Sequence, residues 1–314
     1  MHTDGSEGGG GVSEARQAGV HGFRARRGAA PRNDHPESPY QTRVHGSAEI
    51  GFVRRGGGTR LAHLYQHDPL RVLFPAADGD PAALAVIATT SGGLVAGDRL
   101  ALAVDAGPGV VAHVTGSAAE KVYRSTGLTT EIRQRLSVEP GGWLEYLPPE
   151  AILFDGARLR RDTTVHLAAG AGFLGGGIVV FGRRARGEAF TRGLLREVWE
   201  IQRDGELVWG DALHIDGDVT AVMADPACFD RAGACATLIL APPDGEPRRF
   251  LDEARAVQDR AADLRADVTA VNGLLVARWL GEPFVLRRAY ADLACHLRQA
   301  AMGLPARLPR LWHV

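Results

Sequence analysis

The sequence contains little cysteine, no excess of either charge and no long apolar run. Its three cysteines, Cys228, Cys235 and Cys295, are too few and too widely spaced for a disulfide framework or a zinc knuckle. The 36 basic and 37 acidic residues nearly cancel, which excludes an electrostatic footprint for nucleic acid or an anionic membrane. No run approaches the roughly 18 apolar residues of a membrane span, and the N-terminus lacks the apolar core of a signal peptide. We therefore expect a soluble protein of the reducing cytoplasm.

Common catalytic motifs are also missing from the sequence. It contains no H-E-x-x-H, G-x-S-x-G or C-x-x-C pattern. The eleven histidines are scattered singly, and His113 and His166 fall within strand patterns, where core or surface roles are commoner than ligation. Glu145 and Glu150 are paired carboxylates that leave a β-rich hydrolase open as an alternative. The residues alone favour a protein that is not an enzyme.

Two glycine motifs resemble nucleotide-binding loops but depart from them. In SGGLVAGDRL (91–100), Asp98 stands where a phosphate-binding loop needs lysine, and a carboxylate there repels phosphate. GAGFLG (170–175) is followed by a strand-like run, whereas a dinucleotide site needs the N-terminus of a helix at that point. Neither motif predicts a nucleotide site.

The chain divides by composition into a tail and one domain. Residues 1–45 are rich in glycine, arginine and proline and lack apolar periodicity, which predicts a disordered tail. Residues 46–314 have regular apolar patterning, which predicts a single β-rich domain.

A two-part pattern recurs in this domain at an interval of about 30 to 34 residues, as expected for stacked repeats. Each unit consists of apolar alternation, a turn and a second alternation. The units span residues 100–116, 132–148, 163–182 and 198–215. We predict a hairpin in each unit and a mainly β fold in which the hairpins stack into a helicoid or solenoid-like architecture.

Two helices are expected near the C-terminus. Apolar residues at i, i+3, i+4 spacing predict a helix over 248–266, and a second one starts at Pro283 and ends at Gly303. Between them, 268–280 reads as a hairpin with a turn at Asn272-Gly273.

Six ordered motifs resemble the urease accessory protein family UreD, which is called UreH in some organisms. They are LAHLYQHDPLRVLFP (61–75), SGGLVAGDRL (91–100), EKVYRS (120–125), WLEYLPPEAILFDGARL (143–159), FGRRARGEAF (181–190) and LPRLWHV (308–314). The resemblance runs from about Ile50 to the C-terminus. It implies a urease maturation scaffold that binds a UreF-like protein, reaches a UreG-like GTPase through it, and docks on apo-urease. It further implies transient Ni²⁺, with Zn²⁺ as an alternative, passing through an internal channel, and no permanently bound cofactor.

Isolated carboxylates suit a nickel path because they bind this ion more weakly than imidazole or thiolate does. We select Asp98, Asp211 and Glu120 as weak, transfer-type metal contacts. The alternative role of Asp98 is a turn aspartate that binds backbone N–H groups. The alternative for Asp211 is an outward-facing position on a strand.

Neighbouring residues are expected to have channel or structural roles. They are Gly92, Gly93, Gly97, Lys121, Arg124 and Glu188. We expect the three glycines to adopt positive φ, and Glu188 to pair with Arg183 or Arg184. Members of the family often carry an aromatic and then a polar or acidic residue where this chain has Gly176 and Gly177, which implies a wider or differently lined path. A purely structural β-module with no metal role remains a further alternative.

Overall fold

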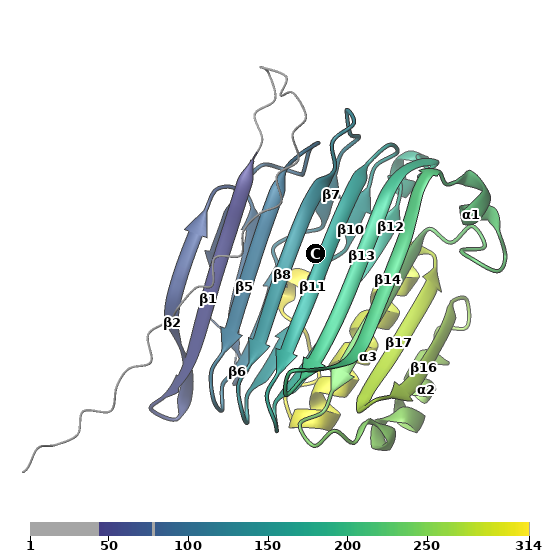
Figure 1. Cartoon of the computed structure of the whole chain (residues 1–314). Coiled ribbons are helices and arrows are strands. Elements are labelled where there is room, and N and C mark those ends of the chain that lie inside the picture. The colour runs from purple at the N-terminus through teal and green to yellow at the C-terminus, as the bar shows by residue number, and fades with distance from the viewer. Residues whose placement is uncertain (1–43, 77–78, 314) are drawn as a thin grey trace, which may run out of the picture. The chain divides into compact units, whose positions relative to one another are not determined.

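Two β-sheets form most of the described part of the chain (Figure 1). The computed structural model describes residues 44–76 and 79–313, and the expected tail over residues 1–45 falls almost wholly outside them. One sheet has seven strands and the other has ten. The prediction of a mainly β, solenoid-like fold with a few helices near the C-terminus is confirmed.

The seven-stranded sheet has the order β14-β13-β11-β8-β5-β1-β2. Its strands are β1 (His45–Arg55), β2 (Gly58–His67), β5 (Arg99–Ala106), β8 (Thr130–Val138), β11 (Arg158–Leu167), β13 (Arg192–Arg203) and β14 (Glu206–Asp218). The five strands from β1 to β13 run parallel, and β2 and β14 pair antiparallel at the two edges.

The ten-stranded sheet has the order β16-β17-β15-β12-β9-β6-β4-β3, and off this path the short strand β10 pairs with β12 and with β7. Its strands are β3 (Leu70–Leu73), β4 (Ala83–Thr89), β6 (Val111–Gly116), β7 (Glu120–Val122), β9 (Trp143–Tyr146), β10 (Ala151–Leu153), β12 (Gly172–Phe181), β15 (Ala234–Ala241), β16 (Arg265–Val271) and β17 (Leu274–Gly281). The strands β4, β6, β9 and β12 pair in parallel.

The chain winds between the two sheets, so three of the four expected hairpins do not form. β5 and β6 lie in different sheets, and the same holds for β8 and β9 and for β11 and β12. Each strand pairs instead with its counterpart in the next coil. Only β13 and β14 form the predicted hairpin. The pattern could not distinguish these cases, because a strand with one buried face alternates in the same way whichever neighbour it pairs with.

The turns between the sheets stack on one another at the predicted interval. The amide of Gly109 donates to the carbonyl of Pro140 in the next coil over 3.1 Å, and Gly172 donates to Gly142 over 2.9 Å. These bonds satisfy backbone groups that the turns would otherwise leave unpaired. Each repeat in the sequence therefore corresponds to one coil, and successive coils stack on one another.

Helices follow the coils. They are α1 (Thr220–Ala224), α2 (Leu251–Gln258) and α3 (Pro283–Met302), with 3₁₀ turns at Arg184–Arg186, Pro247–Phe250 and Arg310–His313. The prediction for α3 is confirmed, including Gly303 in the left-handed region at φ 66°. The predicted helix over 248–266 is too long, because Arg265 and its successors pair with β17 as strand β16. Asn272 and Gly273 form the expected turn, with φ of 47° and 78°.

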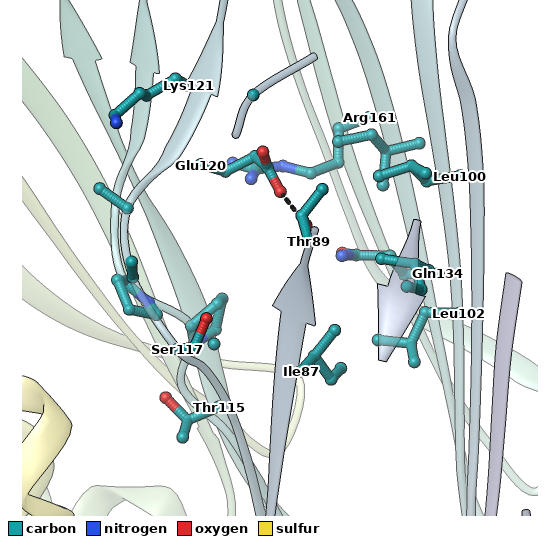
Figure 2. A pocket seen from close by; sticks show the side chains of 18 of the residues that line it. Ile87, Thr89, Leu100, Leu102, Thr115, Ser117, Glu120, Lys121, Gln134 and Arg161 are labelled. Carbon is teal, nitrogen blue, oxygen red and sulfur yellow. Dashed lines mark hydrogen bonds between the residues drawn. The ribbon is translucent and has the colours of Figure 1, made fainter. Parts of the chain in front are cut away.

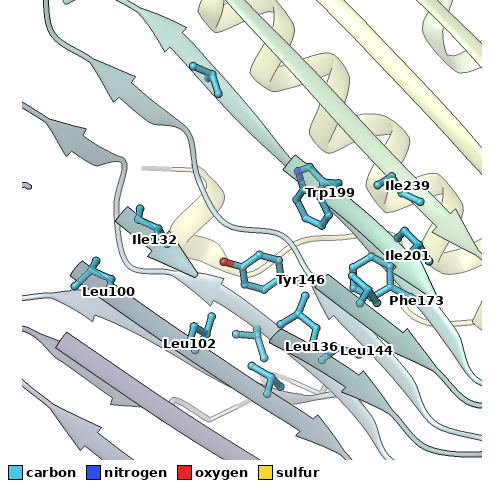
Figure 3. Close-up of a cluster of buried hydrophobic side chains, with 14 of the residues drawn as sticks. Leu100, Leu102, Ile132, Leu136, Leu144, Tyr146, Phe173, Trp199, Ile201 and Ile239 are labelled. Carbon is cyan, nitrogen blue, oxygen red and sulfur yellow. The ribbon is translucent and has the colours of Figure 1, made fainter. Parts of the chain in front are cut away.

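Two apolar layers hold the sheets and helices together. Figure 3 shows the layer between the sheets, where Leu102 and Leu136 of one sheet face Leu144 and Phe173 of the other. The second layer lies between the ten-stranded sheet and the helices α2 and α3. An apolar layer covers each face of the ten-stranded sheet. Burial of these layers determines which strand residues point toward which face.

Gly176 on β12 allows a close approach that no other residue would permit. A Cβ atom there would lie 2.0 Å from the carbonyl oxygen of Thr237 on β15. We therefore expect Gly176→Ala to lower the free energy of unfolding by about 1–3 kcal/mol, measured by urea denaturation. Gly210→Ala on β14 is the matched control, because nothing lies within 4 Å of its added Cβ. Equal effects of the two substitutions would contradict the close approach.

Candidate functional site

A cavity of about 200 Å³ lies between the two sheets (Figure 2). Leu100 and Gln134 line it from the seven-stranded sheet, and Thr89, Glu120 and Tyr146 line it from the ten-stranded sheet. Among the sequence-predicted residues, Gly92, Gly93 and Lys121 line it as well. The cavity therefore gathers part of the predicted set.

Glu120 supplies a carboxylate to this cavity from the start of β7. Its Oε2 accepts a hydrogen bond from the Thr89 hydroxyl over 2.7 Å. Burial raises the pKa of Glu120 above its ordinary value, and the Thr89 hydrogen bond and the Arg161 charge oppose this rise only in part. A carboxylate that water solvates poorly gains from a nearby cation. Glu120 is thus suited to a transient cation contact.

The glycine loop shapes one wall of the cavity. Gly92, Gly93 and Gly97 have φ of 72°, 151° and 86°, so the expected positive φ is confirmed for all three. A Cβ atom on Gly93 would lie 2.5 Å from the Tyr123 ring and 3.0 Å from the carbonyl oxygen of Lys121. The loop therefore packs against the strand that carries Glu120.

Asp98 lies outside the residues that line the cavity, and its side chain is 1% exposed. Its Oδ1 accepts from the Val44 amide over 3.2 Å, and its Oδ2 accepts from the Val95 amide over 2.9 Å. This is the geometry of its alternative role, a turn aspartate that holds backbone N–H groups. The Asp98 charge also lies close enough to Glu120 to raise the pKa of that carboxyl. A metal contact at Asp98 stays a prediction.

Arg124 and Glu188 take part in ion pairs and do not line the cavity that contains Glu120. Arg124 Nη2 lies 3.3 Å from Asp155 Oδ2, and Glu188 Oε1 accepts from the Asp155 amide over 2.9 Å. Arg183 donates to the other oxygen of Glu188, as expected from the sequence. Lys121 differs from this pair of residues, because it is exposed and lines the cavity.

Asp211 occupies a different place in the fold. Its Oδ2 lies 2.8 Å from Nη2 of Arg278, so the pair joins β14 of one sheet to β17 of the other. It does not line the cavity that contains Glu120. The described residues contain no group of three or more His, Cys, Asp or Glu side chains that could hold a metal ion. In the described part of the chain, the three selected acids therefore do not form one metal-binding cluster.

Arg161 and Glu197 form a buried pair that the sequence analysis missed. Arg161 lines the cavity and is 6% exposed, and its Nε and Nη2 donate to Glu197 over 2.8 to 3.0 Å. A Cβ on Gly177 would lie 3.4 Å from Arg161 Nη2 and 3.5 Å from Glu197 Oε1, so this glycine leaves room for the pair. Arg161 shares its face of β11 with Leu159 and Val165, and Glu197 shares its face of β13 with Leu195 and Trp199. A charge at such an inward position was the available signal.

Glu145 and Glu150 are each engaged in their own contacts. Glu145 is 0% exposed and accepts hydrogen bonds from Trp143 Nε1 and from Arg298 Nε, and it contacts His113 Nδ1 at 2.6 Å. Glu150 lies 3.4 Å from Arg287. A general acid or base must reach its substrate or a water molecule. The full burial of Glu145 removes the geometric support for a hydrolase that uses this region.

The fold and the cavity together define a two-sheet β-solenoid. Most of the charged side chains in its interior are held in ion pairs. The sequence profile of the family described as "UreD urease accessory protein" matches residues 44–313. A urease accessory protein UreD of Magnetococcus marinus is 43% identical over 286 residues, covering 88% of this chain and 98% of the relative. UreD proteins of a Methylobacterium species and of Xanthobacter autotrophicus are 42% and 41% identical, each over 88% of this chain and over 97% and 92% of the relatives.

The chain therefore belongs to the UreD urease accessory protein family. The resemblance carried by the six motifs is confirmed. Within the described range, no helix combines the length and the apolar character needed to cross a membrane.

Ionisation of Glu145 is expected to make the stability of the fold depend on pH. Although burial opposes ionisation, the His113 hydrogen bond and charge and the Arg298 charge lower the pKa of Glu145 from 4.5 to about 2. Because the folded pKa is depressed, the ionised carboxylate stabilises the fold above about pH 4.5, and this contribution is lost as the pH falls toward 2. Glu145→Gln should therefore cost about 3–5 kcal/mol at pH 7, since it removes one of the two carboxylates that compensate the buried Arg298 charge.

The stability difference between wild type and Glu145→Gln should narrow by about 3 kcal/mol between pH 5 and pH 2. Urea denaturation at several pH values measures it. Glu200→Gln on the exposed face of β13 is the control and should change stability little at any pH. A difference at Glu145 that does not vary with pH would contradict the assigned charge network.

Proposed function

We propose that this chain is a cytoplasmic urease maturation factor and not an enzyme. Acting with a UreF-like protein and a UreG-like GTPase, it docks on apo-urease and assists nickel insertion, and the ion passes through the interior between the sheets. Family membership supports the role in urease maturation, because the relatives are named urease accessory proteins. The cavity that contains Glu120 is the observation that supports passage through the interior.

The chemistry of the cavity fits transfer better than storage. A carboxylate, a hydroxyl and backbone carbonyls are weak nickel ligands compared with imidazole or thiolate, so an ion held by them is released readily. Arg161 would repel a cation if its charge were uncompensated. Its paired hydrogen bonds to Glu197 neutralise that charge locally.

An exposed apolar edge supports the scaffold role. Leu61, Leu64 and Tyr65 on β2 are 44%, 38% and 49% exposed, and Leu73 at the end of β3 and Phe74 after it are 55% and 39% exposed. β2 and β3 are edge strands of the two sheets. Exposed apolar side chains gathered at sheet edges are typical of surfaces that partner proteins cover.

Deletion of the protein tests the proposed function directly. In cells that express urease, we expect the deletion strain to contain urease protein with little nickel, measured by elemental analysis of the purified enzyme. Added nickel should restore activity poorly, because insertion and not supply is limiting. Fully metallated urease in the deletion strain would rule out the maturation role.

Glu120→Gln tests the interior path. It retains the size and hydrogen-bonding capacity of the side chain but removes its charge, so we expect nickel insertion to slow by about three- to ten-fold, equivalent to about 1 kcal/mol in the barrier. The nickel content of urease after a fixed induction time measures the effect. Glu200→Gln is the matched control on the exposed face of a strand. The proposed path through this cavity loses its support if both variants load urease equally.

Substitutions at Asp98 and Asp211 distinguish a metal-transfer role of these residues from a purely structural role. Asp98→Asn retains an acceptor oxygen for a backbone amide, and Asp211→Asn retains one for Arg278. A structural β-module predicts that both variants, when folded and bound to their partners, leave urease nickel unchanged. Reduced nickel in a folded variant supports a metal contact at that residue.

A further inference from the structure

The loop between β12 and β13 is a surface feature to which the nickel path assigns no role. It contains the motif FGRRARGEAF (181–190), of which residues 183–187 are exposed. The backbone turns through the 3₁₀ segment Arg184–Arg186, and Gly182 before it adopts a φ of 85°. A Cβ atom on Gly182 would lie 2.3 Å from the carbonyl oxygen of Glu188, so the two ends of the loop approach closely. The motif therefore builds a tight, exposed loop.

Two charged residues of this loop hold it in place. Arg183 Nε donates to Glu188 Oε2 over 2.9 Å, and the other oxygen of Glu188 accepts from the Asp155 amide over 2.9 Å. The Arg183 guanidinium also lies 4.5 Å from the centre of the Phe154 ring. These contacts anchor the loop to the segment that follows β10. The charges of Arg183 and Glu188 compensate one another, so this pair is structural.

Arg184 and Arg186 differ from Arg183, because their side chains have no such partner. Both residues are exposed, and within the described range of the chain neither side chain takes part in an ion pair or a hydrogen bond. A guanidinium is always charged and presents five N–H donors in a planar fork. The anchored loop therefore presents two uncompensated cations to the outside.

The Arg184 side chain lies beside the start of α3. A Cβ atom on Gly233 would lie 3.3 Å from Arg184 Nε and 2.9 Å from Cδ of Pro283, the first residue of that helix. Phe284 follows Pro283 and is 74% exposed, more than any other large apolar side chain of the described residues. The loop and the helix start thus bring an exposed aromatic and exposed arginines to one region of the surface.

The acids next to this region are engaged in local bonds. Glu282 precedes α3, and its Oε2 accepts from the Val285 amide over 2.9 Å, which caps the helix. Glu188 is bound by Arg183. Arginine and aromatic side chains are enriched among the residues that carry most of the energy of protein–protein interfaces. Exposed charges at such a surface select a partner of the opposite sign.

We propose that Arg184, Arg186 and Phe284 form a docking surface for a partner protein whose own surface is acidic and partly apolar. Carboxylates of the partner pair with the two guanidinium groups, and an apolar site on the partner covers the Phe284 ring. The proposal rests on the proposed function, because the partner is one of the proteins with which this chain assembles. The surface belongs to other elements than the apolar edge of β2 and β3, so the scaffold has a second place to bind.

Binding of purified apo-urease and of a UreF-like protein, each titrated separately against the full-length chain, tests this surface. We expect the double substitution Arg184→Glu, Arg186→Glu to weaken binding of one of them by about ten-fold or more at low salt. The difference from the wild type should shrink as salt is raised to about 1 M, because salt screens exposed charges. Phe284→Ala should weaken binding of the same protein by about ten-fold at both salt concentrations.

Matched controls come from exposed positions elsewhere in the fold. Arg55→Glu alters an exposed arginine at the end of β1, and Leu207→Ala truncates a side chain that is 60% exposed at the start of β14. Both controls should bind as the wild type does. Because all the substituted residues are exposed, every variant should fold, and thermal melting checks this.

Three outcomes would overturn the proposal. One is that neither protein binds the wild-type chain, and another is that the charge-reversal and Phe284→Ala variants bind both proteins as tightly as the wild type does. The third is that a duplex DNA probe binds the wild type and is lost on charge reversal while both protein interactions persist. The nickel content of urease in the deletion strain is a separate measurement, so failure of this surface and failure of the maturation role are distinguishable.

Discussion

The parallel ladders between successive coils are the constraint on which the rest of the structure depends. β5, β8, β11 and β13 pair in register, as do β6, β9 and β12. Because side chains alternate along a strand, this register decides which residues face the interior and which face the helices. A slip of one residue in β11 would turn Arg161 outward and place Asp162 or Arg160 among apolar side chains. The cavity and its charges therefore depend on the backbone pairing of strands far apart in sequence.

The interior tolerates charge because nearly every charged group has a partner. Arg161 and Glu197 compensate one another, and Glu145 faces Arg298 and His113. Removal of one member leaves a buried charge uncompensated, which costs more than the pair contributes. Glu120 differs from these groups, because its hydrogen-bond donor is the Thr89 hydroxyl and not a cation.

The sequence revealed the local features of the fold and left the distant pairings undetermined. Period-2 alternation, the turns near Pro108 and Pro140 and the glycine after α3 are local signals, and the structure contains each of them. Three of the four predicted hairpins did not form, because alternation does not say which strand is the partner. The helix predicted over 248–266 is shorter, ending at Gln258, and pairing with β17 outweighs helical propensity at Arg265. The contact of Glu145 with Arg298 spans 153 residues, and no local pattern encodes it.

The contact between Glu145 and Arg298 also changes the interpretation of the acidic residues in the sequence. Glu145, half of an apparent carboxylate pair, instead ties β9 to α3 and, through Arg298 and Asp80, to the segment before β4. Arg298 Nη1 further donates to the carbonyl of Arg307 over 2.8 Å, which holds the C-terminal segment against the sheet. The same Glu145 carboxylate contacts Nδ1 of His113, so the network also orients this buried histidine. Asp98 holds backbone amides, while Glu120 lines the cavity between the sheets. Burial and bonding partners, and not the presence of an acid, therefore separate the carboxylates that maintain the fold from one that lines a cavity.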